Sequence, residues 1–77
     1  MAALLDLPKN ASAEIVNVTG GKMFRMRLEA MGIRVGKTVS RVSSQLMGGP
    51  IIVSIDGRQT AMGRNMAAKI KVEIPDE

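Results

Sequence analysis

The sequence predicts an all-β fold: a small five-stranded antiparallel β-barrel with one helix between the first and second strands. Five short segments rich in β-branched residues are separated by glycine, proline and aspartate turns. One segment of helix formers lies between the first and the second. In a chain of 77 residues, expected to form a single domain over 1–77, five strands enclose a core only by curling into a barrel.

The chain opens with a short apolar segment and the first predicted strand. The leucines within residues 4–7 predict a single helical turn that places their side chains in the core. Residues 13–19 are β-branched and apolar, which is typical of a strand, and Gly20 and Gly21 end it.

Residues 22–31 predict the helix, because they are helix formers and Gly32 follows at the position of a left-handed C-cap. At about 100° per residue, its apolar side chains fall on two opposite faces. One face holds Phe24, Leu28 and Met31 and is expected to pack on the barrel. The opposite face, expected to be exposed, holds Met23, Met26 and Ala30.

The second strand is predicted over residues 38–44, after a tight connection that contains Gly36. Its apolar anchors are Val39 and Val42. Their spacing of three breaks the alternation of a regular strand and indicates a β-bulge.

A hairpin is predicted from residues 51–55 and 58–62, because Asp56-Gly57 is a strong signal for a type I′ turn. Residues 63–68 have room for one helical turn. The last strand is predicted over residues 69–74, with alternate residues pointing inward. Those inward residues are Ile70, Val72 and Ile74.

The position of the helix distinguishes among small barrels. An OB-fold places its helix between strands three and four, and Sm-like rings place theirs before strand one. A helix between strands one and two therefore favours an SH3-like barrel.

The composition argues against an enzyme and against a tight metal site. The chain has no Cys and no His, so its serines have no imidazole base and zinc has none of its usual thiolate or imidazole ligands. We expect no tightly bound cofactor or metal. A weak, oxygen-ligated Fe(II) site at Glu29 or Asp56 stays open.

Basic residues are concentrated in residues 21–41, where six of them face one acidic residue, a net charge of +5. Such a stretch fits an acidic partner, a nucleic acid or an anionic membrane surface. Phe24 is the only aromatic residue, so bases would lack the usual stacking platform. A basic nucleic-acid-binding barrel is therefore kept as an alternative, and DNA binding is not expected.

The longest apolar run has five residues, which is too short for a membrane span or a signal peptide. We therefore expect a cytoplasmic protein without direct membrane insertion.

Residues 27–36, RLEAMGIRVG, resemble a segment of the ferrous iron transport protein A (FeoA) family with the pattern R-L-x-x-[ML]-G-[FILM]-x-x-G. Val35 stands where the family often has proline. Residues 49–51 resemble the family's turn before the hairpin, and residues 64–72 resemble its closing R-x-x-A-x-x-I-x-V pattern. The resemblance covers residues 4–74.

This resemblance implies a small accessory or regulatory protein that supports Fe(II) uptake through a FeoB-type GTP-dependent membrane transporter. The expected partner is that transporter's cytoplasmic GTP-binding domain, contacted protein to protein. The resemblance also implies that the same kind of domain forms the last domain of metal-dependent transcriptional repressors. A metal-responsive regulatory domain is therefore an alternative. The sequence leaves open whether the protein stimulates or restrains GTP hydrolysis and whether it forms a homo-oligomer.

The predicted docking surface combines the exposed apolar face of the helix, Met23, Met26 and Ala30, with the neighbouring Arg25 and Arg34. A competing interpretation packs the two methionines against the N-terminal leucines or against a second copy of the chain.

Structural roles are expected for the rest of the motif. Arg27 is expected to tie the end of the helix to a loop carbonyl, and an Arg25–Glu29 pair is expected along the helix. The residues assigned to structure are Arg27, Leu28, Gly32, Gly36 and Gly57.

Overall fold

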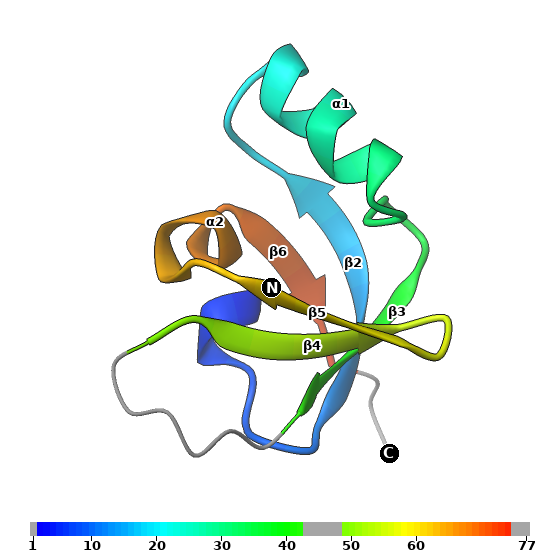
Figure 1. Cartoon of the computed structure of the whole chain (residues 1–77), viewed down its shortest axis with the longest axis vertical. Coiled ribbons are helices and arrows are strands. Elements are labelled where there is room, and N and C mark those ends of the chain that lie inside the picture. Colours follow the sequence, from blue (N-terminus) through cyan, green and yellow to red (C-terminus); the bar gives the residue numbers. More distant parts are fainter. Residues whose placement is uncertain (1, 43–48, 75–77) are drawn as a thin grey trace.

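Six strands form one curved antiparallel sheet in the order β1-β6-β2-β3-β4-β5 (Figure 1). The structure is a computed structural model that describes residues 2–42 and 49–74. The strands are β1 (Ala2–Ala3), β2 (Ser12–Val18), β3 (Thr38–Val42), β4 (Ile51–Ile55), β5 (Arg58–Met62) and β6 (Ile70–Glu73). The helices are the 3-10 helix η1 (Leu4–Asp6), α1 (Lys22–Ala30) and α2 (Arg64–Ala68).

The predicted topology is confirmed, with one addition. The long helix α1 lies between β2 and β3, which are the first and second of the five predicted strands. The addition is β1, where Ala2 pairs with Val72 and Ala3 with Lys71 of β6. Ser43 and Ser44, the predicted end of the second strand, lie outside the described residues.

The predicted β-bulge lies in a different strand. β3 pairs regularly with both neighbours, so the bulge expected between Val39 and Val42 is wrong for the described residues. The irregularity is in β2, where Ile15 pairs with Val72 of β6 but Asn17 pairs with the preceding Lys71. The extra residue, Val16, lets Ile15 and Val18 both be buried although they are three apart.

The hairpin is formed as predicted, because Asp56 and Gly57 both have positive φ, 54° and 80°. The last strand is shorter than predicted. Its final pair with β2 joins Glu14 to Glu73, so Ile74 lies beyond the ladder and is exposed. The expectation that Ile74 points inward is therefore wrong.

The core lies inside the curved sheet, and the N-terminal segment closes part of it. Leu4 and Leu7 are buried, as the sequence predicts, and η1 packs against α2. The guanidinium of Arg41 in β3 donates hydrogen bonds to the carbonyls of Leu5 (3.0 Å) and Leu7 (2.9 Å). The other buried side chains are Ala13, Ile15, Val18, Leu28, Ile33, Val39, Ile51, Val53, Ile55, Met62, Ala67, Ile70 and Val72.

In the part of the chain that the structure describes, none of the helices has the length and hydropathy needed to cross a bilayer.

Candidate docking site on helix α1

Helix α1 extends from one end of the sheet and is held at both ends by glycine turns (Figure 1). It begins after Gly21, whose φ is 90°. At its other end, the amide of Gly32 donates to the Glu29 carbonyl and that of Ile33 to the Leu28 carbonyl. This pair of bonds is the Schellman motif that the position of Gly32 predicts.

Only one side chain of α1 is buried. Leu28 is fully covered by the core, while Phe24 and the following Met31 are half-buried against it. The predicted inner face of the helix is therefore confirmed. The helix rests on the barrel mainly through Leu28.

The ring of Phe24 fixes the first turn of α1 against the chain that leads into it. A Cβ atom added at Gly20, where φ is 113°, would lie 2.9 Å from Cδ2 of this ring. The ammonium group of Lys69 lies 5.0 Å from the ring centroid, within cation–π range. Gly20 and Lys69 together therefore hold this ring in place at the start of α1.

The outer face of α1 is exposed to solvent. Met23 is 79% and Met26 is 53% exposed, and Ala30 is exposed beside them. Neither methionine is among the side chains that pack against the core, to which Leu4, Leu5 and Leu7 belong, so the interpretation that packs them against the N-terminal leucines is wrong for the described residues.

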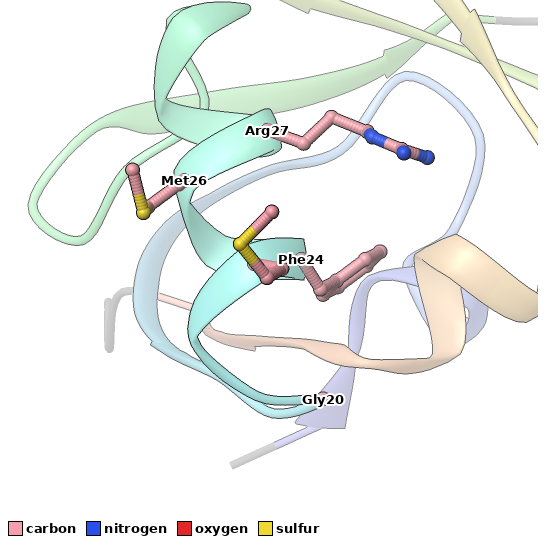
Figure 2. A pocket seen from close by; sticks show the side chains of 5 residues that line it. Gly20, Phe24, Met26 and Arg27 are labelled. Atoms are coloured by element: carbon pink, nitrogen blue, oxygen red, sulfur yellow. The ribbon is translucent and has the colours of Figure 1, made fainter.

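A hollow of about 520 Å³ runs along α1. Figure 2 shows Phe24 and Arg27 extending from one side of the helix and Met26 from the other. The hollow is lined by Gly20, Met23, Phe24, Met26 and Arg27.

The hollow does not include the two arginines of the predicted docking surface. Arg25 and Arg34 are exposed but do not line the hollow, whereas Arg27 does. The sequence held a signal for this, since Arg27 is four residues after Met23 and thus about 40° from it around the helix. Phe24 also belongs to the hollow, although the sequence assigns it to the core face alone.

Two expected polar contacts of the helix are wrong. The side chain of Arg27 has no hydrogen bond to another described residue, and the carbonyl-binding role assigned to it belongs to Arg41. Arg25 and Glu29 do not pair; the ion pair within residues 2–42 and 49–74 joins Lys37 to Asp56 at 2.9 Å. The glycines assigned to structure all have positive φ: Gly32 at 84°, Gly36 at 95° and Gly57 at 80°.

The described residues contain no group of three or more acidic side chains that would hold a metal ion. The two carboxylates considered for Fe(II) lie on different elements: Glu29 is on α1, and Asp56 is in the β4–β5 turn. Asp56 forms an ion pair with Lys37.

The fold and the site together define a small β-barrel domain of the SH3-like type with an exposed helix inserted after its first long strand. The FeoA domain family model matches residues 2–74, nearly the whole chain. The chain therefore belongs to the FeoA domain family, which is associated with ferrous iron transport.

Two relatives agree with this assignment, and a third supports the fold. The chain is 43% identical to a Methanocaldococcus jannaschii protein assigned provisionally as Fe(2+) transport protein A. The alignment spans 47 residues, which is 61% of this chain. The match spans 55% of that relative, so the chain aligns with about half its length. A crystal structure of an iron uptake regulatory protein, FeoA, is 30% identical with a TM-score of 0.83, and the match covers 94% of this chain and 93% of that one.

The third relative supports the fold alone. It is the zinc-complexed crystal structure of Stenotrophomonas maltophilia FeoA, described as a prokaryotic SH3 domain protein. It is 23% identical with a TM-score of 0.79, and the match covers 95% of this chain and 91% of that one. The SH3-like barrel expected from the sequence is confirmed.

Proposed function

We propose that this protein is an accessory factor for Fe(II) uptake that binds the cytoplasmic GTP-binding domain of a FeoB-type transporter through the outer face of α1. The observation that carries the proposal is the exposure of Met23 and Met26 on a helix that extends from the barrel. Membership of the FeoA family supplies the link to ferrous iron transport.

Two large apolar side chains side by side in water are typical of a contact surface. Covering a large apolar side chain is worth about 1.5–3 kcal/mol, and α1 forgoes most of this at Met23 and Met26. Methionine adapts its shape to a partner because it is unbranched and flexible. The exposed Arg25 and Arg34 would orient the approach and raise its rate, since rim charges act mainly on association.

The proposal is tested by single substitutions of matched charge. Met23→Glu or Met26→Glu should leave the fold intact and reduce transporter-dependent Fe(II) uptake, because a carboxylate desolvated in an apolar contact is costly. Ile74→Glu is the control, because Ile74 is 51% exposed and follows β6 rather than lying on α1. Uptake of labelled iron is measured in cells that lack their own copy of the gene, and folding is checked by circular dichroism.

Normal uptake in both folded methionine variants would show that α1 is not the contact surface. Unfolding of either variant, with Ile74→Glu folded, would place that methionine in the structure of the domain instead.

We further propose that the protein acts without a tightly bound metal ion. Elemental analysis after chelation and dialysis should find no stoichiometric transition metal, because the chain has no Cys or His. A stoichiometric metal would contradict this. A weak oxygen-ligated Fe(II) site, removed by the chelator, would not.

A further inference from the structure

The hollow along α1 is lined by apolar side chains and by one cationic side chain, that of Arg27. Its apolar part is formed by the Phe24 ring and the side chains of Met23 and Met26. At its edge is Arg27, which is exposed and has neither an ion pair nor a hydrogen bond with any described residue. Figure 2 shows that the Arg27 and Phe24 side chains extend from the same side of the helix.

We propose that this hollow binds an acidic segment of a partner protein, with two apolar side chains that flank Met23, one toward Phe24 and one toward Met26, and an adjacent carboxylate on Arg27. The inference deepens the proposed function, on which it rests for the identity of the partner, because it names the chemistry that the partner must present.

Charge complementarity selects an acidic occupant. Among the residues that the structure describes, none that lines the hollow is acidic. The nearest basic neighbours along the helix, Lys22 and Arg25, are exposed and add to the positive potential around Arg27. An arginine beside an apolar surface suits a carboxylate especially well, because its planar guanidinium donates two parallel hydrogen bonds to the two oxygens.

Shape selects a protein segment over a lipid surface. The exposed methionines line a hollow, so the surface receives a protruding side chain rather than a flat bilayer. Helices that lie in membrane interfaces present a broad apolar face. The outer face of α1 offers only two large apolar side chains within its nine residues.

The direct test observes the methionine methyl groups by NMR of the full chain. The probe is a dodecapeptide with two leucines four residues apart among glutamates. In one control peptide serines replace the leucines, and in the other lysines replace the glutamates. The acidic leucine peptide should shift the Met23 and Met26 methyl signals and leave Met62, which is 3% exposed, unchanged. Both control peptides should bind about tenfold more weakly or worse.

The role of Arg27 is tested by charge reversal against a matched arginine. Arg27→Glu should weaken binding of the acidic peptide about tenfold or more and favour the lysine peptide, since a charge-assisted pair is lost and its sign reversed. Arg58→Glu makes the same change at an exposed arginine at the start of β5, outside the proposed docking surface, and should alter binding by about threefold at most.

Three outcomes would overturn the inference. They are equal binding of the acidic and lysine peptides, equal effects of Arg27→Glu and Arg58→Glu, and absence of any shift at Met23 and Met26 with the acidic peptide. Vesicles of phosphatidylcholine and phosphatidylglycerol (3:1) are tested in parallel. If they shift the same methyl signals and the acidic peptide does not, the occupant is a lipid surface and the inference is wrong.

Failure of the inference is distinguishable from failure of the proposed function. If the acidic peptide binds through Arg27 but Met23→Glu leaves iron uptake normal, the hollow serves another acidic partner and the transporter proposal fails. If Met23→Glu reduces uptake but the peptides show no preference for acid, transporter docking stands and the acidic-segment inference fails.

Discussion

The barrel and helix α1 differ in how much of their surface they bury. Strand β4 buries every second residue, Ile51, Val53 and Ile55, in only five positions. Helix α1 has nine residues and buries one, Leu28. Both segments are rich in apolar side chains, so the difference comes from position: β4 lies within the sheet, whereas α1 extends from its end (Figure 1).

This difference separates stability from binding. Substitutions inside the barrel should change the free energy of unfolding of the whole domain. Substitutions on the outer face of α1 should change binding and leave that free energy nearly constant. The following predictions test this separation, beginning with the largest expected effect.

Ile70→Ala should unfold most of the population. Ile70 is fully buried in β6, next to β2, and its truncation should cost about 2–5 kcal/mol. A single core of this size supplies only about 3–5 kcal/mol in total. Chemical denaturation measures the loss. The matched control is Ile74→Ala, at a 51% exposed isoleucine just beyond the same strand, which should cost about 0.5 kcal/mol or less.

Leu28→Ala should release α1 before it unfolds the barrel. Leu28 is the one buried side chain of the helix, and we expect a cost of about 2–3 kcal/mol because the helix lies at the surface, where part of the cavity closes. Hydrogen exchange should show the amides of α1 losing protection ahead of those in β4. Simultaneous loss in both would mean that helix and barrel unfold as one unit.

Gly20→Ala should have an effect no larger than that of Leu28→Ala, composed of two terms. The strain at φ 113° costs about 1–2 kcal/mol, and displacement of the Phe24 ring, 2.9 Å from the new Cβ, adds about 1 kcal/mol. Gly32→Ala isolates the first term, because its φ is also positive, 84°, but a Cβ there meets nothing within 4 Å. Thermal denaturation compares the two, and equal losses would show that the Phe24 contact is easily displaced.

The Lys37–Asp56 ion pair should contribute least. Its side chains are 40% and 61% exposed, and exposed pairs are worth about 1 kcal/mol at most. A double-mutant cycle with Lys37→Met and Asp56→Asn, where asparagine tolerates the positive φ of the turn, should give a small coupling that falls further at high salt. A coupling that salt leaves unchanged would show that the pair is shielded from solvent.

Most of this fold can be predicted from the sequence, because the turn residues and the alternation of apolar and polar residues in the strands are strong local signals. Asp56-Gly57 determines the hairpin, and Gly32 determines the end of α1. The β-bulge was missed because local spacing is ambiguous. Ile15 and Val18 are three residues apart, as Val39 and Val42 are, and only the pairing partners decide which spacing needs an extra residue.

The candidate site was predictable in part. Helical periodicity identified the exposed methionines, since Met23 and Met26 need only the helix and its buried face to be placed. The role of Arg41 was not predictable in this way. Arg41 reaches the carbonyls of Leu5 and Leu7, more than 30 residues away in the chain, and no local pattern contains that contact.

The extra residue in β2 also has a geometric consequence for α1. A bulge bends its strand and increases its twist, and only Thr19, Gly20 and Gly21 separate the end of β2 from the start of α1. The direction in which the helix leaves the barrel therefore depends on the number of residues before it. Removing Val16 would let Ile15 and Val18 alternate regularly in the core and would turn the helix, with its methionines and Arg27, toward a different part of space. An insertion or deletion in β2 therefore changes the orientation of the proposed binding surface, whereas a substitution on the outer face of α1 changes its chemistry.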